Sequence, residues 1–483
     1  MKKNISVLII AILALTSCES WIDVKPVSEI ARSTYWNQEG DVKGYLVGIY
    51  TDFRGVLNET FYKEDRGDAM DNGIVGTTSN AWKNSLSVSN APNWMKFYTH
   101  LHHCNLLLKY GSPIPFISAS DKNRVLAETY FQRAYILLLL TQSYGDIPIV
   151  LIPTESAIQE RPVRSPAIDV VNQVLADVDM AISLFPEDAI ISRFKASKAA
   201  ALALKAEALA WKYEVLKSGN IQDVDNALTA LETAETISKA QIGAPGTYAS
   251  VFSDKENTEV IFSIYNGINE AEGMYASRLT TAVTYISSAV NKESIPYSKG
   301  GNARHENAPS AKLKSLFATN DNRAAVAYIE AKRANGQVIL TAQNKFRGTI
   351  YPDADRHFDN NIIVYRLADI VLLRAELLAL SNRVPEAIVQ LERTRTRAGI
   401  GAYTGATTKD EVAKEILNER ARELCFELKR WPDLMRAHAS GTINIFDVVP
   451  NMSGKTEQSC PLYFPIQQAM IDINPNLIQT SGY

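Results

Sequence analysis

The sequence of 483 residues predicts an all-α protein, in which helix pairs form one compound domain with long irregular loop insertions. Apolar residues recur at spacings of three and four in several long segments, which is the pattern of helices with one buried face. No Pro/Gly/Ser-rich linker or run of charge divides the chain, although it is longer than one ordinary core usually grows. Two stretches, about 57–92 and 240–360, lack the helical period and are predicted to be insertions.

The first predicted helix pair lies in the first half of the chain. Asp121 to Tyr144 carries a regular apolar stripe, with Asp121 as the expected N-cap and Gly145 as the stop. Ala167 to Leu184 repeats the stripe. The two segments are therefore expected to pack on each other.

Two further pairs and a last helix follow the same pattern. Alanines line the first of these helices and permit close packing. The predicted helices are Arg193 to Leu216 with 227–237, Tyr365 to Leu380 with Pro385 to Arg397, and finally Lys409 to Leu428. Pairs of roughly 34 to 45 residues resemble tetratricopeptide units, although no strict period recurs.

The irregular stretches differ from the helical body in composition, because they are rich in Gly, Asn, Ser, Thr and Tyr. They hold one predicted strand, Val260 to Tyr265. Long irregular segments on a rigid body usually carry binding residues, so the ligand site is expected there.

The amino terminus has the pattern of an export signal. Lys2 and Lys3 precede an apolar run, Ile5 to Leu15, which is too short to span a bilayer. Leu15-Thr16-Ser17-Cys18 resembles a bacterial lipobox, so we expect a signal peptide at 1–17, lipidation of Cys18, a tether at 18–30 and the helical domain at 31–483. The alternative is an ordinary secretory peptide with an incidental cysteine. Diacylation and an acyl cap on Cys18 would suffice for stable anchoring.

The net charge and the cysteine content limit the kinds of partner and site that the sequence supports. A net charge of −3 and a pI near 6.2 provide no basic field for nucleic acid. Apart from Cys18, the sequence has Cys104, Cys425 and Cys460, which are widely spaced. Their number and spacing indicate neither a disulfide framework nor a zinc site.

Motifs in the last third resemble a known family. Asn418 to Glu427 (NERARELCFE) followed by Arg430 to Arg436 (RWPDLMR) is similar to the signature of the SusD/RagB family of outer-membrane nutrient-binding lipoproteins. Tyr365 to Glu376 and the closing segment 464–483 also resemble that family, as do Arg133-Ala134-Tyr135 and the turn at 144–148. The resemblance implies the fold, an outer-membrane position facing the cell exterior, and delivery of ligand to a SusC-type TonB-dependent transporter. It leaves the ligand open.

Carboxylates in the signature segment are expected to be structural. Glu419, Glu423 and Glu427 recur every four residues with arginines between them, so ion pairs can form along the helix. Arginines favour ionised carboxylates and not the raised pKa of a general acid. We therefore expect no enzyme; a glycoside hydrolase would need a carboxylate pair in a cleft at roughly 5 to 9.5 Å.

Metal binding receives little support from the sequence. His100, His103 and Cys104 could share a helix face, but the leucines around them favour packing. Asp353 and Asp355 could join a calcium site with loop carbonyls. No cofactor is predicted apart from the lipid on Cys18.

Aromatic and amide side chains of the irregular stretches are the candidate ligand contacts. Sugars have apolar C–H faces and hydroxyls, which suit flat rings with amide partners. The candidate rings are Trp82, Trp94, Tyr275, Tyr285 and Tyr297, and the candidate amides are Asn80 and Asn269, with Asn84 and Asn93 nearby. Each could equally serve in packing, Trp94 above all because it begins a helical stripe.

The sequence thus predicts a surface protein that binds oligosaccharides without changing them. One alternative is peptide binding, as in the RagB branch, which hydrogen-bond donors for an extended backbone would favour. Another is a scaffold of the transporter with no ligand site of its own. The hydrolase is the remaining alternative.

Overall fold

A computed structural model describes residues 35–59, 62–75, 79–156, 160–270, 278–300 and 303–483. The described chain is mainly helical, with short strands in two-stranded sheets, which confirms the predicted all-α class. The predicted signal peptide, the tether and Cys18 lie outside the described residues. Among the described helices, none has the length and apolar character needed to cross a membrane.

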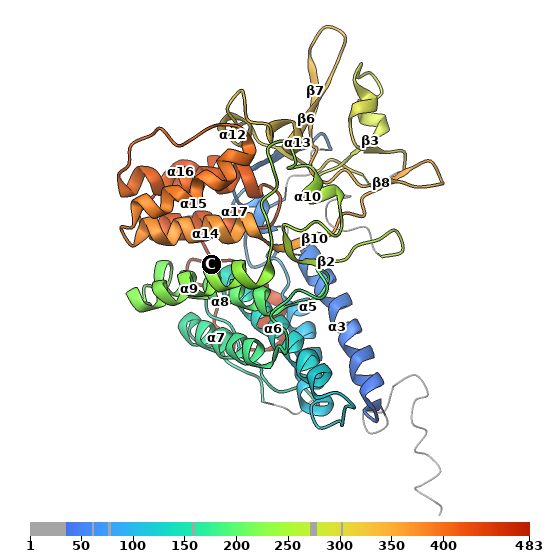
Figure 1. Ribbon diagram of the computed structural model, residues 1–483, viewed down its shortest axis with the longest axis vertical. Helices are drawn as coiled ribbons and strands as arrows, with labels where there is room; N and C mark the ends of the chain where they lie inside the picture. Colours follow the sequence, from blue (N-terminus) through green and yellow to red (C-terminus); the bar gives the residue numbers. More distant parts are fainter. Residues whose placement is uncertain (1–34, 60–61, 76–78, 157–159, 271–277, 301–302) are drawn as a thin grey trace, which may run out of the picture.

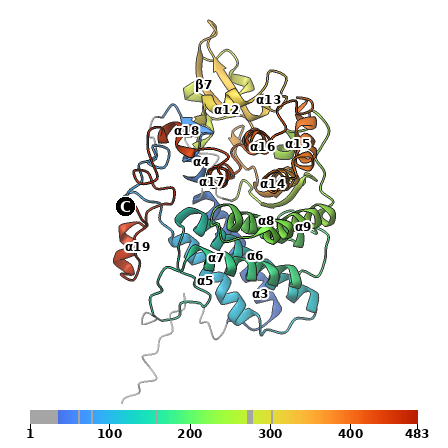
Figure 2. The same cartoon turned by 90° about the vertical axis from the view of Figure 1, so that its left-hand side faces the viewer.

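Long helices form a stack in chain order, drawn as layers in Figures 1 and 2. Each helix from α6 to α9 packs on the next one in the chain. Helix α9 then contacts α14, which packs on both α15 and α16. These helices and their neighbours are α3 (Glu39–Glu59), α5 (Met95–Leu106), the π-helix η2 (Leu107–Gly111), α6 (Ala119–Tyr144), α7 (Ala167–Leu184), α8 (Lys198–Glu214), α9 (Ile221–Ser238), α14 (Leu367–Leu380), α15 (Val384–Ala398), α16 (Lys409–Leu424) and α17 (Arg430–Ala439). All the predicted pairs are present.

Three predicted helix ends were wrong. The N-cap of α6 is Ser118 and not Asp121, because the Ser118 hydroxyl accepts a hydrogen bond from the Asp121 amide at 3.2 Å. Helix α8 begins at Lys198, capped by Ser197, and not at Arg193. Helix α14 begins at Leu367, since Tyr365 and Arg366 belong to a strand.

The segment predicted as one helix from Lys409 to Leu428 is also broken. Helix α16 ends at Leu424, and the backbone of Phe426 and Leu428 has positive φ before α17 starts. The Lys345 ammonium donates to the carbonyl oxygens of Glu423 and Cys425 at 3.0 and 2.9 Å. This buried cation satisfies carbonyls that a continuing helix would have used.

The predicted irregular stretches carry short elements and little regular structure. The first holds α4 (Tyr62–Asp65) and β1 (Met70–Asn72). The second holds α10 (Ser250–Ser253), β2 (Val260–Ile264), β3 (Thr281–Ala282), η3 (Val283–Ile286), η4 (Lys292–Ser294), β4 (Tyr297–Ser298), β5 (Asn307–Pro309), α12 (Ala311–Leu316), α13 (Ala324–Ala327), β6 (Tyr328–Lys332), β7 (Val338–Gln343), β8 (Thr349–Ile350) and β9 (Arg356–His357). After α17 come α18 (Ile445–Val448), η5 (Pro450–Met452) and α19 (Gln468–Ile473).

A buried strand pair closes the base of the second insertion. Strand β2 pairs antiparallel with β10 (Ile362–Arg366), so the chain returns to α14 beside the point where it left the helices. All residues of both strands are buried. The other sheets pair β1 with β5, β3 with β4, β6 with β7 and β8 with β9. The β6–β7 hairpin projects at the top of Figure 1, and β8 projects to the right in its upper half.

Alanines and aliphatic side chains fill the main core, which runs through the helical stack. In α8, Ala199, Ala203, Ala206 and Ala210 are buried, as their spacing predicts. A smaller core around Ile286 and Leu340 lies within the second insertion. The rigid stack therefore carries both insertions on packed helices.

Candidate functional site

A cleft of about 510 Å³ opens in the first insertion, where the end of α3, the loop before α5 and the start of α5 meet. Amide side chains are the most frequent polar groups in its lining. The lining residues are Asn58, Asp65, Ser79, Asn80, Ala81, Leu86, Asn90, Pro92, Asn93, Met95, Lys96 and Arg278. An amide offers a donor and an acceptor side by side, which matches the hydroxyl groups of a sugar.

Local turns hold two of these amides in place. The Asn93 side-chain oxygen accepts from the Met95 amide at 2.7 Å, just before α5. The Asn90 oxygen accepts from the Ser87 amide at 2.8 Å. Both oxygens are thus oriented by backbone, whereas Asn80 is half-buried in the cleft wall. Such fixed groups lose little freedom when a ligand binds.

Asp65 is the one acidic side chain among the described residues that line the cleft. Its carboxylate accepts from Ser79 Oγ at 2.9 Å and Asn307 Nδ2 at 2.8 Å, and it pairs with Arg278 at 3.1 Å. Burial raises the pKa of Asp65, and Arg278 opposes that rise. The described residues of this lining thus contribute one carboxylate, whereas a glycoside hydrolase needs a pair.

The candidate rings near the cleft turn toward the core. Trp82 is half-buried and packs against the main core, and its indole N–H donates to the Met70 carbonyl at 3.2 Å. Trp94 is 4% exposed and contacts the rings of Tyr98 and Tyr144. Trp82 is therefore partly packed against the core, and its contact with a ligand stays a prediction.

The remaining candidates are separated from this cleft. Tyr285 and Tyr297 pack against the smaller core of the second insertion, and both are half-buried. Asn269 is exposed and does not line the cleft. Tyr275 lies outside the described residues. Ligand contact by these four residues stays a prediction; of the candidate residues, the cleft gathers Asn80.

Comparisons with known proteins place the chain in a family. A sequence model of the SusD family matches residues 262–483, and a second model, described as starch-binding associating with outer membrane, matches residues 20–208. The chain belongs to the SusD family. SusD-like protein P38 of Formosa agariphila is 26% identical over 532 aligned positions, which cover 100% of this chain and 99% of the relative.

Solved structures of SusD-like proteins share the fold over nearly their whole length. NanU of B. fragilis is 26% identical, with a TM-score of 0.79 over 95% of this chain and 100% of its own. A SusD superfamily protein from Bacteroides fragilis is 21% identical, with a TM-score of 0.81 over 93% of this chain and 100% of its own. The predicted family membership is confirmed.

The SusD-type signature of α16 forms a buried charge network. The Glu423 carboxylate accepts hydrogen bonds from Arg366 at 2.6 Å and from Arg323 at 3.0 Å, and it also pairs with Arg397. Burial alone would raise the pKa of Glu423, but these three arginines hold it well below its usual range. Glu423 and Arg366 are wholly buried, so this carboxylate reaches no ligand.

The network differs from the predicted one in where the partners come from. Within α16, Glu419 pairs with Arg422 at 2.8 Å, as the spacing predicts. Its other partner, Arg323, comes from the second insertion and donates at 2.7 Å. Burial would raise the pKa of Glu419, but Arg323 and Arg422 lower it to about 2. The prediction of ionised, structural carboxylates is thus confirmed, with mainly long-range partners.

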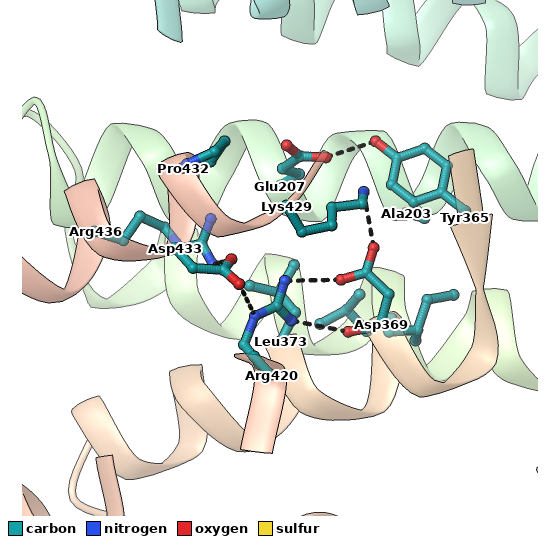
Figure 3. Close-up of a pocket in the computed structure, with 12 residues that line it drawn as sticks. Ala203, Glu207, Tyr365, Asp369, Leu373, Arg420, Lys429, Pro432, Asp433 and Arg436 are labelled. Carbon is teal, nitrogen blue, oxygen red and sulfur yellow. Dashed lines mark hydrogen bonds and ion pairs between the residues drawn. The ribbon is translucent and has the colours of Figure 1, made fainter. Parts of the chain in front are cut away.

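A second polar void, drawn in Figure 3, belongs to this same scaffold. Its volume is about 10 Å³, which is room for roughly one water molecule. Lys429 pairs with Asp369 at 2.8 Å, and Arg420 bridges Asp369 and Asp433 at 2.9 and 2.8 Å. A void of this size inside an ion network cannot admit a sugar.

Side chains considered as metal ligands are buried in the core or have other partners. His100 is buried in the core, and burial lowers its pKa to about 3. The Asp353 carboxylate accepts from the Asp355 amide at 3.0 Å and from His357 at 2.8 Å. Asp355 accepts from the Lys299 and Gly300 amides. In the part of the chain that the structure describes, no group of three metal-ligating side chains gathers.

Proposed function

We propose that this SusD-family protein captures oligosaccharides at the cell surface and delivers them, chemically unchanged, to a TonB-dependent outer-membrane transporter. The observation that carries the proposal is the cleft in which Asn58, Asn80, Asn90 and Asn93 meet beside Asp65 and Arg278. Its volume of about 510 Å³ falls in the range of small-molecule sites. The family description as starch-binding with outer-membrane association supports the ligand class.

The walls of the cleft favour sugar over a peptide bound as an added strand. A peptide bound as an added strand needs an exposed strand edge with unpaired backbone groups. The cleft offers side-chain amides and hydroxyls, and its walls are loops and helix ends. Sugar hydroxyls both donate and accept, so each amide can serve them through both of its atoms.

Glycan-array binding by the mature chain, followed by calorimetric titration of the best ligand, tests the ligand class. We expect dissociation constants in about the micromolar to millimolar range, because a few hydrogen bonds and apolar contacts must offset the cost of association. Binding to peptide libraries with no glycan bound would support the peptide alternative. Absence of any ligand would support the transporter scaffold.

Attachment through Cys18 accompanies this proposal, because it would hold the cleft at the membrane where the transporter lies. Cys18→Ser should leave the protein folded but unprocessed or released from the outer membrane. Fractionation with detection of the acylated form measures this. A mature, acylated Cys18→Ser protein in the membrane fraction would contradict the anchor.

A further inference from the structure

An aromatic and aliphatic patch surrounds the point where the described chain begins. The ring of Trp36 lies 5.1 Å from that of Tyr35, 4.8 Å from that of Tyr45 and 6.4 Å from that of Tyr110. All four rings are half-buried, so part of each faces solvent. We name this surface the basal patch; its members are Tyr35, Trp36, Tyr45, Tyr110, Phe116 and Ile117.

Ile117 completes the patch from the loop before α6. It is 96% exposed, the highest value among the large hydrophobic side chains of the described residues. Its backbone amide donates to Glu39 Oε2 at 2.9 Å, which fixes the loop against the first residue of α3. A single exposed aliphatic side chain is ordinary, but this one follows Phe116, which packs on the same small core as Trp36 and Tyr45.

Two lysines border the basal patch, and each is paired with a nearby carboxylate, Lys43 with Asp121 at 3.1 Å and Lys109 with Glu155 at 2.6 Å. The Lys43 ammonium lies 5.6 Å from the centre of the Phe116 ring, and the Lys109 ammonium lies 5.0 Å from that of Tyr110. Both lysines are partly exposed. Tyrosine and tryptophan rings at headgroup level, with lysine chains that reach toward water, are typical of membrane-interface contacts.

The position of the patch in the chain favours the lipid bilayer as the surface that it contacts. Tyr35 follows Cys18 by 17 positions, so the covalent chain allows a separation of at most about 60 Å between them. Helix α3 begins at the bottom of Figure 1, at the end opposite the β6–β7 hairpin and β8. An anchor on Cys18 is therefore joined to the body at this end.

We infer that the basal patch rests on the lipid surface and sets the orientation of the tethered protein, with Ile117 and the rings entering the headgroup region. The inference rests on the proposed attachment at Cys18. A shallow contact of this kind would bury side chains by about 5 to 10 Å. It would also keep the second insertion directed away from the membrane.

Site-specific fluorescence on vesicles tests the inference without depending on acylation in the cell. A histidine tag replaces residues 1–18, and nickel-chelating lipid captures the chain on vesicles of phosphatidylethanolamine and phosphatidylglycerol. An environment-sensitive dye is attached at Ile117→Cys or, as the matched control, at Ile350→Cys, which is 63% exposed on β8 at the other end. Cys104, Cys425 and Cys460 are buried and should not react.

The two dyes should differ on the vesicles. At position 117 we expect a blue shift, quenching by nitroxide lipids and iodide quenching reduced about threefold or more relative to position 350. Equal iodide quenching at both positions would overturn the inference. Protection of position 117 that appears only in native membranes containing the transporter would also overturn it, in favour of a protein contact. Because Ile117 is exposed, its replacement should not unfold the domain, and Cys18→Ser fractionation reports separately on the anchor.

Discussion

Polar side chains gather in two regions of this molecule with opposite surroundings. Around α16 they are charged and wholly buried, and Glu423 alone meets three arginines. In the cleft of the first insertion, half of them are neutral amides, and they lie on loops and helix ends. Buried charges need complete pairing, whereas a site that exchanges water for ligand needs groups that tolerate both. The two regions therefore serve scaffold and recognition, respectively.

The charge network joins both insertions to the helical body. Arg323 and Lys345 reach from the second insertion to Glu419 and Glu427, at 2.7 and 2.6 Å. Arg430 of α17 pairs with Asp68 of the first insertion at 2.6 Å. The family signature thus holds the insertions in place. The ligand is left to residues outside that signature.

Removal of Glu423 should give the largest effect. Glu423→Ala leaves Arg323, Arg366 and Arg397 short of a buried partner, and we expect a loss of about 3 to 5 kcal/mol in the free energy of unfolding. Calorimetry measures the loss, and glycan affinity should persist in the folded fraction. Glu411→Ala, at an exposed pair on the same helix, is the control and should cost less than about 0.5 kcal/mol. Equal melting temperatures for the two variants would refute the role of the network.

Acid should weaken the same region. The folded-state pKa values of Glu419, Glu423 and Glu427 are lowered, so their stabilisation is complete above the unfolded value near 4.5 and is lost as pH falls through the folded values. For Glu419 the window extends down to about pH 2. The melting temperature should fall steeply below about pH 4.5, and less so in Glu423→Gln. A constant melting temperature between about pH 7 and 3 would count against this assignment.

The sequence predicts those features of the fold that depend on neighbouring residues. Periodicity located three of the helix pairs, and α7 matches its predicted ends, because a stripe of apolar residues fixes which face is buried. It did not locate α3, which packs on α5. The stop of α16 was not predictable in this way, since Lys345 binds its last carbonyls from 80 residues away. The arginine partners of Glu423 were also not predictable, because they too are distant in the sequence.

The cleft was predicted only in part. The asparagines of the first insertion indicated Asn80 and its neighbours, and their repetition along 80–93 was the useful signal. Asp65 and Arg278 come from separate segments and were missed, because nothing local links them. Residue type alone does not separate the two roles of Trp82, since a tryptophan can stack on a ligand or pack on a core.

Substitution of Trp82 tests whether this residue belongs to the packed scaffold or to the ligand site. Trp82→Ala removes core packing and the bond to Met70, so we expect a loss of about 2 kcal/mol, which exceeds that of an ordinary surface change. Thermal unfolding measures it. Trp82→Phe, which keeps a ring but no N–H, should lose less. An unchanged melting temperature together with weakened glycan binding would instead indicate that Trp82 contacts the ligand.

Asn80 should have the smallest effect on stability and the clearest effect on binding. Asn80→Ala removes one amide from the cleft wall, and the loss of one or two neutral hydrogen bonds corresponds to a glycan affinity about two- to tenfold weaker. Because Asn80 is half-buried on a loop, the melting temperature should change little. Asn226→Ala, an exposed amide on α9, is the matched control and should bind as wild type. Titration of both variants with the same array-selected oligosaccharide makes the comparison. If Asn80→Ala binds as tightly as Asn226→Ala, the cleft is not the site, and the second insertion with Tyr285 and Tyr297 becomes the place to search.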